Sequence, residues 1–333
     1  MSQPHERRTL LGSALILFVA ASTVVSCSGQ NAAPAPFTSP GTTDSTSPTA
    51  ASLTPSPTAS PTPTGPELCG PGSALNFDPT AFPESPNIDN KWFPLTPGMQ
   101  YTTTGTVTNA EGSTKRTVVH SVTGLTKVIN GVKTRVMWDQ DISDGELVES
   151  ELAMFAQSKD GAVWLFGEYP EEFEGGKFMG APKTFISGIA GAEAGIAMPA
   201  QPRIGTPAYP QAHAPAVGFL DCGTVLQEHQ RVCVPTACYE DVLVIDEHNP
   251  LEPADGHQRK FYSADTGLVQ VKAVGGADQE TLNLVKAEQL SDAGLKKINE
   301  QALSLEQHAY KLGKSDCAKT PAAALTTESS GGK

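Results

Sequence analysis

Two histidines and two acids late in the chain are the residues whose types and spacing come nearest to a catalytic group. Asp246, Glu247 and His248 are consecutive, and His257 follows nearby. Because side chains alternate across a strand, Asp246 and His248 could share one face and act as an acid–base pair. The chain lacks Gly-x-Ser-x-Gly, His-Glu-x-x-His and phosphate-loop motifs. We therefore expect polar residues beside a turn and no enzyme, with a hydrolase site near His248 as an alternative.

Thiol chemistry is available at five cysteines outside the N-terminal region: Cys69, Cys222, Cys233, Cys238 and Cys317. The central three could bind zinc with His229, but no Cys-x-x-Cys pair is present, so we expect no metal. In an oxidising compartment we expect structural disulfides instead. Cys69 and Cys317 flank the folded region and could link its ends. Cys233 could pair with either Cys222 or Cys238, which leaves one thiol free.

Acidic residues gather in a second region and invite a calcium hypothesis: Asp139, Asp141, Asp144, Glu149 and Glu151. The EF-hand template requires Gly at its sixth position and Glu at its twelfth, where this chain has Asp144 and Ser150. A hairpin turn at Asp144-Gly145 would place Asp139 opposite Ser150, so the two pairs of acids would point to opposite faces. We expect a solvated acidic hairpin. By the same reasoning we expect an exposed turn around Pro170 that carries Glu168, Glu171, Glu172 and Glu174. No cofactor is expected.

The N-terminal region has the order of an export signal. Arg7 and Arg8 precede an apolar run over residues 10–21, which is too short to cross a bilayer comfortably. Val24-Val25-Ser26-Cys27 resembles the lipobox of bacterial lipoproteins. That resemblance implies a signal peptide over residues 1–26 and a thioether-linked diacylglycerol on Cys27. The segment Glu6-Arg7-Arg8-Thr9-Leu10-Leu11 also resembles a twin-arginine signal, so the general and twin-arginine export routes both stay open.

Composition divides the rest of the chain into three parts. Residues 28–66 contain 9 Pro and 16 Ser or Thr, which is typical of a disordered linker. With Cys27 this gives a lipid-anchored linker over residues 27–66. Residues 67–313 are long enough for a single β-rich extracytoplasmic domain. Residues 314–333 are small and polar, and we expect a flexible tail.

The net negative charge of the chain limits the kinds of molecule that it can bind. The chain has 23 Lys+Arg against 36 Asp+Glu, a formal net charge of −13. Nucleic-acid binders need clustered basic residues, so this class is excluded. An acidic surface is also repelled by anionic lipid headgroups. Contact with the membrane should therefore depend on the lipid anchor, and the other partner should be an unknown protein or envelope ligand.

Short β-prone runs alternate with turn signals through most of the domain. The first group predicts strands over residues 99–109, 114–126, 133–142, 146–157 and 162–168. The second group predicts strands over residues 219–234, 239–247, 258–262, 268–273 and 281–288. Asn130-Gly131, Asp144-Gly145 and Asp160-Gly161 suit tight hairpins. Between the groups, the small residues of 187–200 predict a loop or short helix.

One helix is predicted near the C-terminal end. Its apolar stripe recurs at three- and four-residue spacing: Leu295, Ile298, Ala302, Leu305, Ala309 and Leu312. Ser291 could cap the first turn and Gly313 could end the last one. The predicted fold is mainly β, an antiparallel meander forming a large curved sheet or half-barrel, with this amphipathic helix packed on it.

Several short segments resemble a widespread family of uncharacterised bacterial lipoproteins. The matching pieces include Asn90-Lys91-Trp92-Phe93-Pro94-Leu95-Thr96-Pro97-Gly98, Asp144-Gly145-Glu146-Leu147-Val148-Glu149, Asn249-Pro250-Leu251-Glu252-Pro253 and Lys260-Phe261-Tyr262. Together with smaller pieces they span about residues 82–288. The resemblance implies a β-rich fold and a location outside the cytoplasm, attached to the cell membrane. It implies no activity.

Three functions follow from these observations. The leading hypothesis is a lipid-anchored extracytoplasmic binding or scaffold protein of the cell envelope. The first alternative is a carrier or sensor of a hydrophobic ligand held in a cavity of the curved sheet. A continuous apolar cavity on the order of several hundred Å³ would favour this carrier, whereas a filled core would favour the scaffold. The second alternative is an envelope hydrolase with its site near His248. The ligand, the oligomeric state and the disulfide connectivity are left open.

Overall fold

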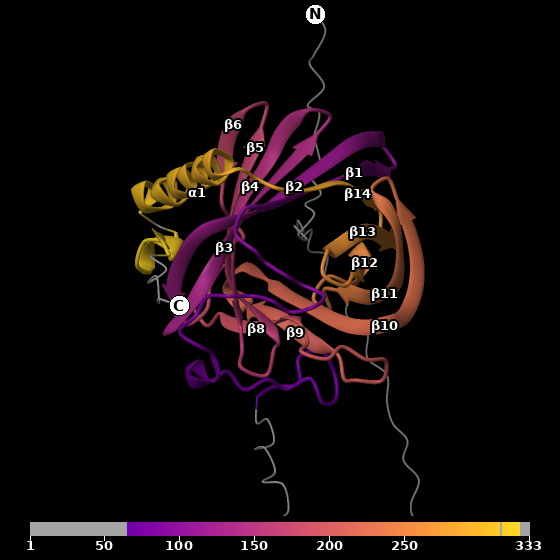
Figure 1. Ribbon diagram of the computed structural model, residues 1–333, viewed down its shortest axis with the longest axis horizontal. Helices are drawn as coiled ribbons and strands as arrows, with labels where there is room; N and C mark the ends of the chain where they lie inside the picture. The colour runs from indigo at the N-terminus through magenta and orange to yellow at the C-terminus, as the bar shows by residue number, and fades with distance from the viewer. Residues whose placement is uncertain (1–64, 314, 327–333) are drawn as a thin grey trace, which may run out of the picture. The chain divides into compact units, whose positions relative to one another are not determined.

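The computed structural model describes residues 65–313 and 315–326, which Figure 1 shows in colour. Three sequence predictions lie outside the described residues: the signal peptide over 1–26, lipid attachment at Cys27, and nearly all of the linker. Among the helices that the structure does describe, none combines the length and the apolar character that a membrane crossing requires.

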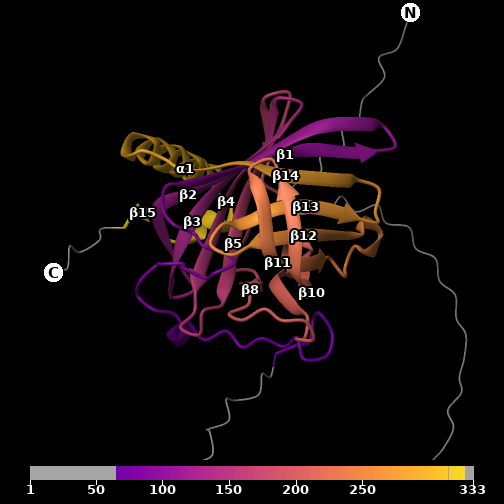
Figure 2. The same cartoon turned by 45° about the vertical axis from the view of Figure 1, so that its right-hand side comes forward.

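Twelve antiparallel strands hydrogen-bond in a closed ring (Figures 1 and 2). In spatial order around the ring, they are β1 (Met99–Asn109), β14 (Gln279–Gln289), β13 (Gly267–Val274), β12 (His257–Ser263), β11 (Ala237–His248), β10 (Phe219–Val234), β9 (Tyr209–Ala214), β8 (Glu193–Met198), β5 (Val163–Glu174), β4 (Glu146–Gln157), β3 (Val132–Ser143) and β2 (Gly112–Ile129). Three short strands pair outside the ring. These are β6 (Lys177–Gly180) and β7 (Phe185–Ile186) on β5, and β15 (Ala324–Leu325) on β2.

The sheet is a closed barrel, so the predicted half-barrel or open curved sheet is corrected. Closure depends on β1, which pairs along one edge with β2 and along the other with β14. Its partner Thr281 lies far along the chain from Thr106, and strand alternation carries no information about such a distant pairing. The main-β class and the single helix that the sequence predicted are both present.

The small-residue segment of 187–200 is the main local difference from prediction. Residues Glu193–Met198 form β8 of the barrel wall instead of a loop or helix, whereas residues 187–192 form turns, in agreement with the predicted loop. Gly195 explains the small residues: a Cβ at this position would lie 2.4 Å from Pro210 O on the neighbouring strand. Glycine therefore permits a close approach of β8 and β9 that a larger residue would prevent.

Successive side chains of the wall contribute to two separate apolar clusters. On β5, Leu165 belongs to the cluster that includes Met137 and Tyr262, whereas Phe166 belongs to a cluster with helix residues. Because neighbours on a strand point to opposite faces, the first cluster fills part of the barrel interior. The second lies on the outside of the wall, beneath the helix.

The helix α1 (Asp292–Leu312) packs on the outer face near β2 and β4, as predicted for its apolar stripe. Its caps follow the sequence prediction. The Ser291 hydroxyl accepts a hydrogen bond from Gly294 N, and Gly313 adopts a left-handed φ of 66° that ends the helix. Ile298, Ala302 and Ala309 are buried, while Leu312 at the helix end is exposed.

The described residues after the helix, 315–326, pack against the barrel instead of forming part of the flexible tail predicted over 314–333. Residues 314 and 327–333 of that predicted tail lie outside the described residues. Residues Asp316–Lys319 form a 3-10 turn, and Ala324 and Leu325 pair with Thr126 and Leu125 of β2. Cys317 is buried in the cluster beneath the helix. A small, polar composition concealed this packing because the segment buries one side chain and is otherwise held through its backbone, which accepts from Lys127 Nζ and Tyr310 OH and donates to Glu306.

Candidate functional site

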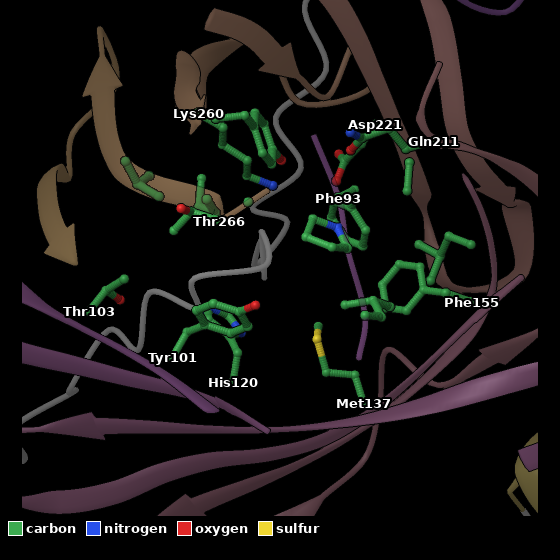
Figure 3. A pocket seen from close by; sticks show the side chains of 18 of the residues that line it. Phe93, Tyr101, Thr103, His120, Met137, Phe155, Gln211, Asp221, Lys260 and Thr266 are labelled. Atoms are coloured by element: carbon green, nitrogen blue, oxygen red, sulfur yellow. The ribbon is translucent and has the colours of Figure 1, made fainter. Parts of the chain in front are cut away.

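A cavity of about 120 Å³ lies inside the barrel (Figure 3). Most of its lining is apolar and includes Phe93, Leu95, Met137, Phe155, Phe219 and Leu268. The cavity is much larger than the space that one water molecule needs, and close to the size of engineered apolar cavities that bind benzene. A small organic molecule could therefore enter it.

Residues Phe93, Pro94 and Leu95 enter the cavity from the segment that precedes β1. Asn90 holds this segment in place: its Oδ1 accepts from Trp92 N at 2.9 Å, and its Nδ2 donates to Gly161 O at 2.9 Å. Figure 3 shows Phe93 between Asp221 and Met137. In the sequence, this segment is notable only for its resemblance to the lipoprotein family. The apolar run Trp92-Phe93-Pro94-Leu95 ahead of the first strand is the sequence signal that could have indicated a role inside the barrel.

Polar residues occupy part of the same lining. They come from separate strands: Thr103 on β1, His120 on β2, Glu168 on β5, Gln211 on β9, Asp221 on β10 and Lys260 on β12. Glu168 and Asp221 are 3% and 4% exposed, so both carboxyl groups are almost completely removed from solvent. The cavity thus joins an apolar region to a set of buried hydrogen-bonding groups.

The acids of β3 and β4 also face the interior, which contradicts the predicted solvated hairpin. Asp139 pairs with Glu151 and Asp141 with Glu149, while Ile142 pairs with Leu147. Val148 is therefore an extra residue, a β-bulge that shifts the register by one position. The shift turns both pairs of carboxylates to the same face, and all four are buried. Residue types alone could not reveal a one-residue bulge.

The predicted turn around Pro170 is also wrong. β5 runs through this proline without interruption, from Val163 to Glu174. Glu168 points into the barrel, whereas Glu171 is buried on the outer side, where it accepts from Tyr169 OH at 2.5 Å and lies 2.6 Å from His308 Nδ1 on α1. Only Glu174, near the end of the strand, is exposed as expected.

Three ion pairs balance part of the interior charge. Lys260 Nζ lies 2.5 Å from Glu247 Oε2, His120 Nδ1 lies 2.9 Å from Asp139 Oδ1, and Arg116 pairs with Asp141. Burial is the largest single influence and lowers the pKa of Lys260, but the Glu247 carboxylate together with Asp221 and Glu168 outweighs it, so the pKa is raised overall. The same competition between burial and Asp139 leaves the pKa of His120 raised. Both bases therefore tend to keep their protons.

Other interior acids tend to stay protonated. Burial, followed by the nearby Glu247 carboxylate, raises the pKa of Asp221 to about 7. Burial also raises the pKa of Glu280 to about 7. For Glu151 and Glu168, burial together with neighbouring carboxylates raises the pKa well above the ordinary value. A protonated carboxyl donates one hydrogen bond and accepts others. The polar part of the cavity can thus bind a ligand's donor or acceptor.

The histidines named from sequence lie on the other face of the sheet. Lys260 and Glu247 point inward, so Asp246 and His248 face outward from β11. The structure brings them together with His257 at the start of β12: His257 Nδ1 lies 2.5 Å from Asp246 Oδ2, and the two imidazole rings stack with centroids 4.8 Å apart. Burial and the neighbouring His257 lower the pKa of His248. The group therefore converges, but away from the cavity.

The disulfides differ in part from the sequence expectation. Cys69 pairs with Cys222, and Cys233 pairs with Cys238 across a short hairpin. The expected Cys69–Cys317 link and the Cys222–Cys233 alternative are therefore both replaced. Cys317 is the free, buried thiol, and burial raises its pKa to about 11. His229 is exposed beside Asp241, so the structure does not bring it into a zinc site with the three thiols.

Comparisons with known proteins add little to this geometry. No model of a protein family matches the chain, and no curated protein gives a significant match. A solved structure from Bacteroides fragilis, provisionally described as an exported protein with a YmcC-like fold, is 13% identical, covers 59% of this chain and 98% of its own, and has a TM-score of 0.35. A provisionally described lipoprotein from Parabacteroides distasonis is 10% identical, with coverages of 59% and 98% and a TM-score of 0.31. These scores are too low to indicate a shared fold, so location and family continue to rest on the sequence.

Proposed function

We propose that this chain is a lipid-anchored extracytoplasmic binding protein that holds a small, mainly apolar ligand inside its barrel and performs no reaction. The observation that carries the proposal is the cavity of about 120 Å³ within the barrel wall. Natural pockets for drug-sized ligands are larger, roughly 300–1,000 Å³. The ligand class is therefore closer in size to a single substituted ring than to a complete acyl chain.

The polar lining defines the other property of the ligand. Asp221 and Glu168 present buried carboxyl groups to the cavity, and the Thr103 hydroxyl and one Glu168 oxygen have no hydrogen-bond partner among the described residues. An unpartnered buried polar atom costs free energy that a ligand group could recover. We therefore infer a ligand with an apolar body and one hydrogen-bonding group.

Binding can be tested on the full chain with toluene and p-cresol, which differ mainly by a hydroxyl group. Both should shift the NMR signal of the Met137 methyl group, which lines the cavity, and p-cresol should bind more tightly. Ala197→Leu should weaken both by adding volume at the lining. Ala287→Leu, at an exposed position of β14, is the matched control. Absence of any shift, or equal binding by the Ala197→Leu variant, would contradict the proposal.

The membrane attachment needs a separate test because Cys27 lies outside the described residues. Metabolic labelling with a radioactive fatty acid should mark the full chain, and Cys27→Ser should remove the label. Cys317→Ser should keep the label because that thiol is buried in the folded protein. A wild-type chain without label would contradict the anchor and leave the cavity proposal untouched.

A further inference from the structure

The outward-facing histidine group has the composition of a metal site. Asp246 and His248 are two residues apart on β11, and His257 is the first residue of β12. Each offers one ligand atom, and these three atoms lie within 4.8 Å of one another. Two imidazole nitrogens and one carboxylate oxygen are a donor set that suits divalent zinc, copper or nickel.

The surrounding contacts orient the Asp246 carboxylate toward His257 and leave His248 Nδ1 without a hydrogen-bond partner among the described residues. The guanidinium of Arg259 lies 3.2 Å from Asp246 Oδ1, so it orients the carboxylate and leaves Oδ2 toward His257. His248 Nδ1 is buried and has no hydrogen-bond partner among the described residues. A metal ion could take the place of the hydrogen-bonding proton between Asp246 and His257. A rotation of the His248 ring could then turn a nitrogen toward the ion as the third ligand.

The backbone holds the three residues close before an ion arrives. Glu247 pairs with Gln258, which places His248 and His257 on either side of the connection between β11 and β12. Pro253–Asp255 form a 3-10 turn within that connection, and Gly256 adopts a φ of 79° just before His257. Ligands carried by paired strands lose little conformational freedom on binding, which favours affinity.

We propose that Asp246, His248 and His257 form a binding site for one divalent transition-metal ion of the zinc class on the outer face of the barrel. Three protein ligands leave at least one coordination position for water or for an external group. The site is separate from the cavity, because Glu247 and Lys260 point inward from the same strands, whereas Asp246, His248 and His257 face outward. It is therefore independent of the small-ligand function.

The test uses the full chain without a polyhistidine tag, titrated with zinc chloride in a calorimeter. We expect one ion per chain, and a loss of affinity of at least about tenfold for both His248→Ala and His257→Ala. His229→Ala is the matched control, because His229 also lies beside an aspartate, at 3.2 Å from Asp241, but the part of the chain that the structure describes offers it no third ligand. It should leave zinc binding unchanged.

Copper supplies a second readout that separates ligation from loss of folding. The electron paramagnetic resonance spectrum of the chain with one equivalent of Cu²⁺ should show splitting from two nitrogens, and from one nitrogen in each histidine variant. Circular dichroism should match across the variants. Zinc binding that does not saturate by about 1 mM, or a His229→Ala variant as impaired as His248→Ala, would overturn the proposal.

Discussion

Lys127 on β2 places its Nζ 2.6 Å from Glu306 Oε1 on α1, and both side chains are almost fully buried. The same Nζ also donates to Pro321 O at 2.8 Å, and the Glu306 carboxylate accepts from Ala323 N. One ion pair therefore connects the barrel wall, the helix and the segment that follows it. The sequence shows both residues but not this connection.

Removal of one partner of this pair should be costly, because the other charge would stay buried without compensation. We expect Lys127→Met to lower the free energy of unfolding by about 3–5 kcal/mol. The double variant Lys127→Met with Glu306→Leu should recover most of that loss. Urea unfolding measures both. A double variant no more stable than the single one would show that the cost arises from packing instead of charge.

The segment after the helix should contribute to stability despite its polar composition. A chain that ends at Gly313 loses the buried Cys317 and the hydrogen bond from Ala323 N to Glu306. We expect a loss of about 2–4 kcal/mol. A chain that ends at Thr326 retains these contacts and is the matched control. Equal stability of the two truncated chains would support the flexible tail that the sequence predicted.

The two disulfides should contribute different amounts to the free energy of unfolding. Cys69 and Cys222 are separated by 153 residues, and Cys233 and Cys238 by 5. In the chain-entropy description, the longer loop restricts the unfolded chain more, by about 5 kcal/mol against about 2 kcal/mol. Alanine substitution of each pair, followed by urea unfolding, measures the difference. Mass spectrometry of an unreduced digest should recover a Cys69–Cys222 peptide, and a Cys69–Cys317 peptide would contradict the pairing.

The interior acids predict a stability that falls as pH rises. The pKa of Asp221 is raised to about 7 in the folded chain, against about 4 in an unfolded chain. Between these values the unfolded chain releases the proton and the folded chain retains it. The contribution of Asp221 is therefore fully present below about pH 4 and is lost toward pH 7, at about 1.4 kcal/mol per pH unit.

The variant Asp221→Asn isolates this contribution because asparagine does not titrate. Its stability relative to wild type should increase from about pH 4 to pH 7, by an amount on the order of 3 kcal/mol. Urea unfolding at several pH values in that range measures the difference. Ala287→Leu, an exposed substitution that involves no titratable group, is the control and should show no such trend. A constant difference for Asp221→Asn would mean that this carboxyl is ionised inside the barrel.

Local features were predictable because they depend on neighbouring residues. The alternation of residues 99–109 predicted β1, and the Ser291 and Gly313 signals predicted both ends of α1. The availability of disulfide cysteines and the convergence of His248 with His257 were also visible as possibilities in the sequence. Each of these follows from side-chain periodicity, capping or proximity along the chain.

The cavity and the charges that line it depend on strand register and on pairings between distant residues, and no short segment of the sequence contains this information. The bulge at Val148 decided that Asp139 and Glu151 face each other inside the barrel, and the pairing of β1 with β14 decided that the sheet closes. Likewise, only the folded chain brings Cys69 to Cys222. By itself the sequence determined most of the wall strands but not β8 and β9, together with the helix and the chemical groups available. The tertiary structure alone decided which groups are enclosed together, because register and long-range pairing set the face on which each side chain lies.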